Sequence, residues 1–356
     1  MRWPWQRSAS GQRLAVSWFG QTLAFVRVAG LGSDFRVLQA GVETQGADTR
    51  EEFVRRLQGL GLKGYVTTVM LRPEQYQLLQ IEVPAVPPEE LRAAARYQIK
   101  DMVDVHLDDL TIDVMRQGDG QGRAASQLFV VAARNSVVRE AMELAAAMQW
   151  DVAVIDVQDM AQRNLQTLVE PERATATLVV GEGPQALLTI SAGGELYYSR
   201  RLELPGGFMA MTWSAEPTQA PAPLDAYTPV EEYVPDYGGG AYGGGMGGAG
   251  NETPGAQTDM DRAQRVVVEV QRSIDLWDRT WSSLPLAGLR VFAGARSMEL
   301  AQWLGREMGQ TVGVVDVPQA WQGAKGVSED ALPLCLPLLG QLLRTDTVSY
   351  THLTLP

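Results

Sequence analysis

The sequence predicts a two-lobed α/β protein, because one pattern of strands occurs twice along its 356 residues. In each half, an apolar run leads through a short glycine-containing turn into a second apolar run, which is typical of a β-hairpin. The first pair covers residues 13–28 and the second covers residues 176–190. A chain of this length can bury two cores. Each hairpin is therefore expected to begin one lobe.

Charge and composition exclude several classes of function. The net charge of −12 is unsuited to non-specific nucleic-acid binding, which needs a basic surface. The single cysteine, Cys335, lies between leucines and is interpreted as a core residue, so an internal disulfide is excluded. The two histidines are His106, in an acidic turn, and His352, near the end of the chain. Neither setting predicts a metal site or a catalytic triad.

The first lobe is expected to span residues 13–172 and to contain a small inserted subdomain at about 76–150. Gly59 and Gly61 end its first helix, and Pro87 and Pro88 begin its second. The predicted elements are a strand meander at 13–44, strands at 65–71, 76–83, 110–116, 126–133 and 152–156, and helices at 51–60, 87–102, 135–148 and 159–168.

The second lobe is expected at residues 173–344. Its last helix carries Pro333 and Pro337, which interrupt it. The predicted elements are strands at 177–180, 186–190, 195–203, 289–292 and 312–315, and helices at 261–281, 298–308 and 331–343.

Two segments are expected to contribute nothing to either core. Residues 208–258 contain many prolines and a glycine-rich run at 238–248, so they predict a disordered insertion within the second lobe. No lysine follows those glycines, which distinguishes them from a phosphate-binding loop. Residues 346–356 look like a translated sequencing adaptor and are treated as an artefactual tail.

The order of these elements resembles the actin-like (ribonuclease-H-like) ATPase fold, and more closely the PilM family of type IV pilus assembly proteins. Within that family, the chain is most similar to the MshI type of the mannose-sensitive haemagglutinin (MSHA) pilus. The stretches that carry the resemblance are 83–99, 129–156, 198–207, and the set 271–275, 292–295 and 340–344.

In active members of the fold, the first hairpin turn supplies an aspartate, a glycine and a lysine, which hold Mg²⁺ and phosphate. Ser17, Phe19 and Ala24 occupy the matching positions here. The carboxylate and the ammonium that would organise the metal and balance the phosphate charge are therefore missing.

The second hairpin also lacks the residues that active members of the fold use to bind nucleotide. Val180, Glu182 and Ala186 align with the expected Asp-x-Gly-x-x-x-Thr, and a shift by one residue restores a glycine but no aspartate. Pro184 also removes an N–H donor. We expect a vestigial nucleotide cleft at Ser17, Gly20, Gly181, Gly183 and Gly294, where the glycines serve chiefly as tight turns. We expect neither hydrolysis nor a cofactor nor a metal, with Mg-ATP binding weak at most.

Two further charged sets have alternative interpretations. Arg200, Arg201 and Arg272 form either a basic rim of the cleft or ordinary solvated charges. Asp156 and Asp159 suggest carboxylate chemistry, but a helix N-cap at Asp159 is the simpler interpretation.

The resemblance implies a non-catalytic cytoplasmic scaffold at the inner membrane of a Gram-negative bacterium. The implied partner is the cytoplasmic N-terminal tail of a PilN-like inner-membrane protein (MshJ in the MSHA system), bound beside residues 76–150. Two alternatives stay open, a nucleotide-binding switch of the same machine and a component of a type II secretion platform. No apolar run long enough for a membrane span occurs, although Trp3 and Trp5 offer a weak lipid contact.

Overall fold

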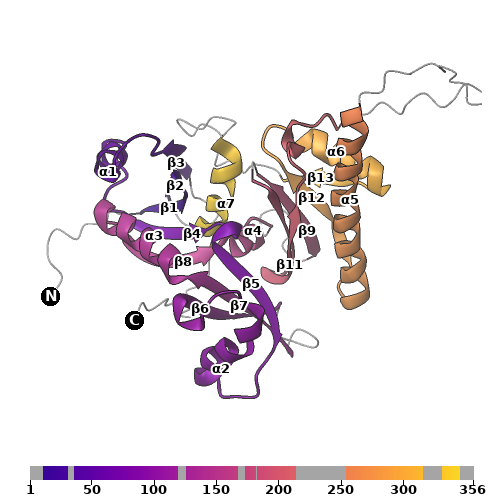
Figure 1. Ribbon diagram of the computed structural model, residues 1–356, viewed down its shortest axis with the longest axis horizontal. Helices are drawn as coiled ribbons and strands as arrows, with labels where there is room; N and C mark the ends of the chain where they lie inside the picture. Colours follow the sequence, from indigo (N-terminus) through magenta and orange to yellow (C-terminus); the bar gives the residue numbers. More distant parts are fainter. Residues whose placement is uncertain are drawn as a thin grey trace, which may run out of the picture.

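The structure is a computed structural model in which two five-stranded sheets and one three-stranded sheet can be followed (Figure 1). It describes residues 11–30, 36–118, 126–166, 173–181, 183–213, 254–315 and 331–344, with side chains in the long helix described from residue 262. Residues 1–10, with Trp3 and Trp5, and the expected tail at 346–356 lie outside the described residues.

The first sheet has the order β3-β2-β1-β4-β8. Its first three strands form an antiparallel meander, as predicted, and β4 and β8 add to it in parallel. Two helices pack on one face, burying Phe53 and Leu57 beside Val138 and Leu144. The elements are β1 (Gln12–Phe19), β2 (Thr22–Ala29), β3 (Arg36–Thr44), β4 (Val66–Leu71), β8 (Asp151–Val157), α1 (Arg50–Gly59) and α3 (Asn135–Met148).

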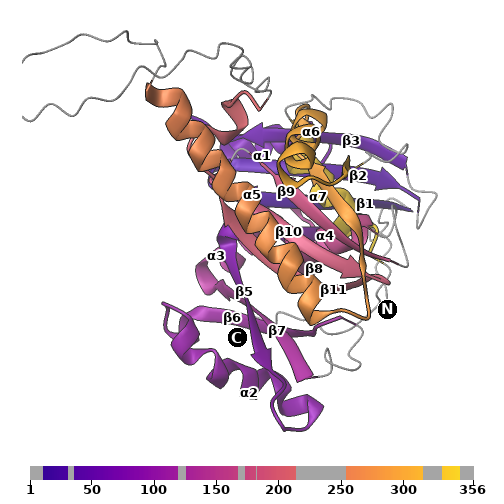
Figure 2. The same ribbon diagram turned by 90° about the vertical axis from the view of Figure 1, so that its right-hand side faces the viewer.

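The second sheet repeats this arrangement with the order β11-β10-β9-β12-β13. Again three antiparallel strands are followed by two parallel ones. The long helix α5 lies across the outer side of this lobe (Figure 2). The elements are β9 (Ala174–Val180), β10 (Gln185–Ala192), β11 (Glu195–Glu203), β12 (Leu286–Phe292), β13 (Val312–Val314), α5 (Pro254–Thr280) and α6 (Ser297–Met308).

A three-stranded antiparallel sheet of order β5-β7-β6 forms the inserted subdomain. It has its own core, in which Ile99 and Val130 are buried. The helix predicted at 87–102 is α-helical only in its middle, with a short 3-10 turn on either side. The elements are β5 (Tyr76–Glu82), β6 (Leu110–Arg116), β7 (Gln127–Arg134) and α2 (Leu91–Gln98). The helix α3, expected within this subdomain, packs instead on the first sheet.

Two helices cross between the lobes, α4 (Gln158–Gln166) and α7 (Leu332–Leu342). They share a buried cluster with side chains from both large sheets, including Val26 and Phe292. At the crossing, a Cβ added to Gly340 would lie 2.0 Å from the carbonyl oxygen of Ala161. The helix α7, expected in the second lobe, also packs on β1 to β4, so it fastens the end of the described chain to the first lobe.

The expected insertion at 208–258 needs correction at both ends. Phe208 and Trp213 are buried in the core of the second lobe. The ring of Trp213 stacks on that of Trp303 with centroids 6.2 Å apart. The helix α5 already begins at Pro254. The segment outside the described residues is therefore 214–253.

Candidate functional site

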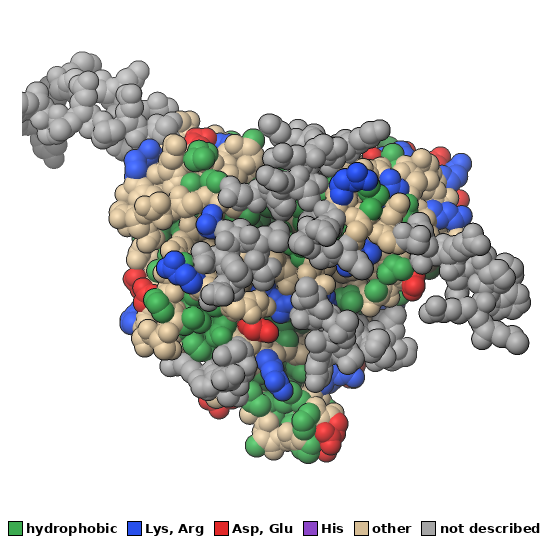
Figure 3. Space-filling view, turned by 180° about the vertical axis from the view of Figure 1, so that it is seen from behind, with side chains coloured by type: hydrophobic (Ala, Val, Ile, Leu, Met, Phe, Trp, Pro, Cys, Tyr) green, Lys and Arg blue, Asp and Glu red, His purple; other side chains and the backbone are tan. Residues whose placement is uncertain are grey.

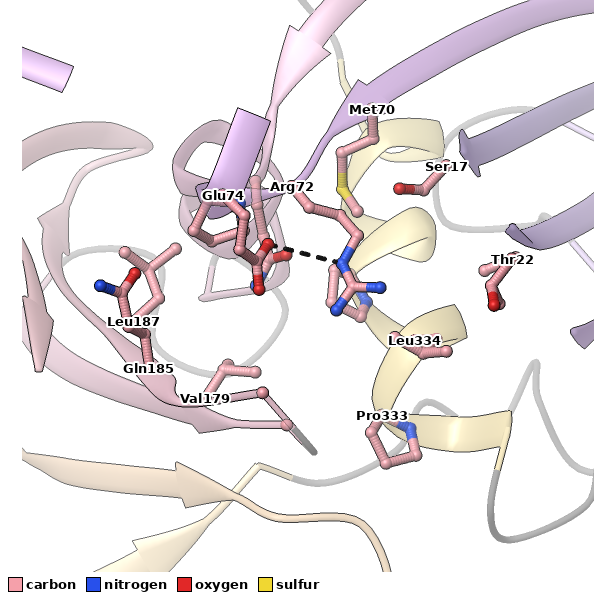
Figure 4. Close-up of a pocket in the computed structure, with 16 residues that line it drawn as sticks. Ser17, Thr22, Met70, Arg72, Glu74, Val179, Gln185, Leu187, Pro333 and Leu334 are labelled. Atoms are coloured by element: carbon pink, nitrogen blue, oxygen red, sulfur yellow. Dashed lines mark ion pairs between the residues drawn. The ribbon is translucent and has the colours of Figure 1, made fainter. Parts of the chain in front are cut away.

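A small pocket lies between the two hairpins, where the lobes meet (Figure 4). Its cavity volume is about 40 Å³, whereas pockets for small ligands usually measure about 300–1,000 Å³. It is lined by Ser17, Thr22, Ala24, Met70, Arg72, Pro73, Glu74, Gln158, Val179, Gly181, Gly183, Gln185, Leu187, Pro333, Leu334 and Pro337. Three of the five expected cleft residues, Ser17, Gly181 and Gly183, thus come together here.

The first hairpin contributes Ser17 from β1. This side chain is 3% exposed, and its Oγ has no hydrogen-bond partner among the described residues. The hydroxyl points toward the pocket beside Met70 and Arg72 (Figure 4). Gly20 does not line the pocket; its φ of 60° forms the turn between β1 and β2, a conformation that glycine adopts without strain.

The second hairpin contributes Gly181 and Gly183, while Glu182 between them lies outside the described residues. A Cβ on Gly183 would lie 3.2 Å from Oε1 of Glu74. Gly294 follows β12 with a φ of 57° and packs against Pro333 of α7, since an added Cβ would lie 3.0 Å from Pro333 Cγ. It therefore borders the pocket through Pro333 without lining it.

Arg72 and Glu74 are the charged residues among the described residues that line this pocket, and no sequence motif pointed to them. The Nε of Arg72 lies 3.7 Å from Oε2 of Glu74. The guanidinium also lies over the ring of Phe19, 5.0 Å from its centroid. The segment is held by Gln75, whose side chain accepts from the Arg72 N–H at 2.9 Å and donates to the Trp18 carbonyl at 2.9 Å. The available sequence signal for Arg72 and Glu74 was their position directly after β4, because ligand sites of α/β sheets lie at the carboxyl ends of strands.

Asp159 lies in the first turn of α4 and connects three parts of the molecule. Its carboxylate accepts hydrogen bonds from the Tyr76 hydroxyl of β5 and from the Ser199 hydroxyl of β11. Arg201 donates to the Tyr76 carbonyl at 2.6 Å. Burial, together with the Asp159 charge, raises the pKa of Tyr76. The N-cap expected for Asp159 is therefore wrong, because its oxygens bind side chains of other elements.

Asp156 and Asp113 line a second groove, between β6 and β8, each of which is the outer strand of its sheet. Asp156 pairs with Arg344 at 2.9 Å, and burial raises its pKa. Asp113 is 9% exposed; its Oδ1 accepts from the Val114 N–H at 2.9 Å, but its buried Oδ2 has no partner among the described residues. Burial raises the pKa of Asp113 to about 6. We call this the β6–β8 groove.

The remaining lining of the β6–β8 groove is mainly apolar, and its cavity volume is about 50 Å³. It consists of Leu71, Thr111, Val114, Met115, Val131, Ala133, Ile155 and Val157. The adjoining subdomain also exposes Val83, Tyr97 and Met102. Hydrophobic side chains gather at this end of the molecule in the space-filling view (Figure 3). Exposed apolar surface of this kind is typical of protein–protein contact.

Of the two interpretations of Arg200, Arg201 and Arg272, a basic rim of the interlobe pocket is wrong, because none of the three lines that pocket. Arg200, Arg201 and Arg272 line a separate groove between β11 and α5, with a volume of about 930 Å³. Arg272 pairs with Glu269 at 2.7 Å, and Arg200 pairs with the same carboxylate. We call this the arginine groove.

Comparison with known proteins identifies the fold class. No family model and no curated protein matches the sequence. Among solved structures, the chain is similar to the PilM–PilN type IV pilus biogenesis complex, with 16% identity, a TM-score of 0.60, and coverage of 93% of this chain and 97% of that one. The fold is the two-lobed actin-like ATPase fold. This confirms the predicted fold class.

Two further solved structures show weaker similarity. One is a Bacteroides thetaiotaomicron protein with an actin-like ATPase fold and unknown function, at 9% identity, a TM-score of 0.46, and coverage of 94% of this chain and 100% of that one. The other is the cytoplasmic domain of EpsL, an inner-membrane component of the Vibrio cholerae type II secretion system, at 12% identity, a TM-score of 0.41, and coverage of 59% of this chain and 78% of that one. Within the described part of the chain, no helix has both the length and the hydropathy for a bilayer span.

Proposed function

We propose that this chain is a non-catalytic scaffold of a type IV pilus assembly machine, most similar to that of the MSHA pilus. It docks to the cytoplasmic tail of a PilN-like (MshJ) inner-membrane partner and lies on the cytoplasmic side of that membrane. The similarity of fold to the PilM–PilN complex supports the machine and the partner. The degenerate hairpins support a role without catalysis.

The observation that carries the non-catalytic role is the ion pair between Arg72 and Glu74 in the interlobe pocket. The described lining offers Ser17 and Ala24 where a metal-organising carboxylate and a phosphate-balancing lysine would be needed. Its one positive guanidinium is paired with the chain's own carboxylate. A triphosphate with Mg²⁺ would have to break this pair and enlarge a cavity of about 40 Å³.

The β6–β8 groove is the proposed site for the partner tail. Its apolar lining suits the side chains of an extended peptide, a recurring mode of recognition. The unpartnered Oδ2 of Asp113 supplies one buried acceptor. A buried acceptor costs free energy until it is paired, so a tail that brings an N–H donor to this point gains over one that does not.

Titration of the purified protein with a synthetic tail of the neighbouring PilN-like protein tests this proposal. Met115→Glu places a charge in the groove and should weaken binding at least tenfold, since a buried unpaired charge costs more than about 1.4 kcal/mol. Met298→Glu makes the same change on an exposed residue of α6 and should leave binding unchanged. Absence of saturable binding by the unaltered protein, or equal effects of both variants, would contradict the proposal.

A further inference from the structure

The arginine groove holds a concentration of positive charge in a chain whose net charge is −12. Its lining contains Arg200, Arg201, Arg262, Arg265 and Arg272, against two carboxylates, Glu203 and Glu269. Glu269 is shared between Arg200 and Arg272. Arg265 has neither an ion pair nor a hydrogen bond among the described residues. Within the described lining, the positive charge of Arg265 is therefore uncompensated.

Several of these guanidinium groups are held in place before any partner arrives. Arg200 lies within 3.4 Å of the Ser273 hydroxyl as well as pairing with Glu269. The Arg201 guanidinium lies over the Tyr76 ring, 4.9 Å from its centroid, while donating to the Tyr76 carbonyl. Guanidinium groups fixed in this way bind carboxylates with less loss of side-chain entropy than mobile lysines.

One wall of the groove is the outer edge of β11, the last strand of the second sheet. Near the start of β11, the Leu196 carbonyl accepts from the Gly118 N–H at 2.7 Å, so this part of the edge is covered. From Ser199 to Glu203, no outward backbone hydrogen bond forms within the described parts of the chain. In an antiparallel strand, alternate residues direct both backbone groups outward. This stretch is therefore a template for a further strand.

We propose that the arginine groove binds an extended acidic segment of a partner protein, which adds a strand to the edge of β11. Strand addition beside a helix uses the free backbone groups for affinity and side chains for specificity. Arg200 faces α5, as its pair with Glu269 shows, so acidic side chains on alternate residues of the added strand would meet the arginines of α5.

The lining favours a polypeptide over a nucleic acid. No aromatic residue is among the described residues that line the groove, although stacking on aromatic rings is a main source of single-strand affinity. The apolar Leu202, Leu204 and Val268 lie among the arginines instead. They suit a segment in which acidic and apolar residues alternate. This second docking surface does not depend on the partner tail proposed for the β6–β8 groove.

A fluorescein-labelled peptide of alternating glutamate and valine tests the proposal by fluorescence anisotropy with the full chain. We expect saturable binding that weakens with salt and falls at least tenfold in Arg265→Glu. Arg279→Glu makes the same charge change on the same helix outside the groove and should leave binding unchanged. Equal losses in both variants, or no saturable binding by the unaltered protein, would overturn the proposal.

Two further probes separate strand addition from other occupants. A peptide with alternate backbone nitrogens methylated should lose binding, because methylation removes the donors of the added strand. Inorganic polyphosphate or oligothymidylate binding as tightly as the peptide would overturn the proposal in favour of a general anion site. Residues 214–253 contain six acidic and no basic residues. Peptide binding that appears only after their deletion would assign the groove to the chain's own segment and would also overturn the proposal.

Discussion

The Nε of Arg72 lies 3.7 Å from the Oε2 of Glu74, and the two side chains stand in the pocket between the hairpins of the two lobes. Glu74 also lies against Gly183 of the second hairpin, so the pair contacts the turn that would otherwise face a phosphate. A bound anion would need Arg72 and would be repelled by Glu74.

Calorimetry with Mg-ATP at millimolar concentration should show no saturable binding to the unaltered protein. Ser17 and Ala24 provide neither a carboxylate for the metal nor a cation for the phosphates, and Arg72 is already paired. Glu74→Gln, which frees the guanidinium but supplies no metal site, should still bind far more weakly than micromolar. Micromolar binding by the unaltered protein would favour the nucleotide-switch alternative.

Asp113 should make stability depend on pH. Its pKa is about 6 in the folded state against an ordinary value of 3.8, so between these pH values the folded state binds more protons than the unfolded state. Protonated Asp113 therefore stabilises the folded state at low pH. The free energy of unfolding should fall as the pH rises from about 4 to 6, because the buried carboxyl group then loses its proton. Above about pH 7, the cost of the buried carboxylate is present in full.

Asp113→Asn should remove this dependence. The neutral amide should raise the free energy of unfolding at pH 8 by up to about 3 kcal/mol, and should change it little at pH 4. Urea unfolding of both proteins at the two pH values measures the difference. Asp156, whose pKa is also raised, remains in both proteins, and its repulsion of the Asp113 carboxylate is part of the measured difference. A loss of stability at pH 8 would show that Asp113 has a partner or a role that this account lacks.

Gly340→Ala should destabilise the protein strongly. The added Cβ would meet the Ala161 carbonyl at 2.0 Å, so α4 and α7 would have to separate. We expect a loss of about 2–4 kcal/mol in urea unfolding. Gly59→Ala serves as control, because it also lies in a helix and its Cβ would meet nothing within 4 Å. That change should be neutral or stabilise by up to about 1 kcal/mol.

Removing residues 214–253 and truncating Trp213 should have different effects on stability. Replacing 214–253 by a short glycine–serine linker should change the melting temperature little, since closure entropy depends only logarithmically on loop length. Trp213→Ala should cost about 3–5 kcal/mol, because the ring is 1% exposed and the Arg296 guanidinium lies 3.9 Å from its centroid. Truncation of the exposed Tyr97 to alanine is the control. Equal melting temperatures for Trp213→Ala and the control would contradict the burial of this ring.

The repeated hairpins and most strands were predictable because apolar periodicity is a local property of the sequence. Trp213 was missed because it sits at the start of a proline- and glycine-rich stretch, and its burial depends on Trp303, which is distant in the chain. Phe208 was also expected to lie in the insertion. Its burial was missed for the same reason, because tertiary packing decides which residues are buried at the edge of an irregular segment.

The candidate site was predictable only in part. Ser17, Gly181 and Gly183 were found from the hairpin pattern. Asp159 was misassigned because its partners, Tyr76 and Ser199, lie 83 and 40 residues away, and nothing local signals them. Arg200, Arg201 and Arg272 were considered together, and they do line one groove. Neither alternative offered for them located that groove, because residue type does not show on which side of β11 a groove opens.

Titration with the PilN-like tail in the presence and absence of Mg-ATP tests the central claim most directly. A scaffold whose interlobe pocket is closed by its own ion pair should bind the tail with the same affinity in both conditions. Because a ligand shifts binding only by its differential affinity for the two states, a nucleotide that does not bind has no influence. Saturable tail binding that is unchanged by Mg-ATP is the predicted result. Tail binding that appears or strengthens several-fold only with Mg-ATP would contradict the account.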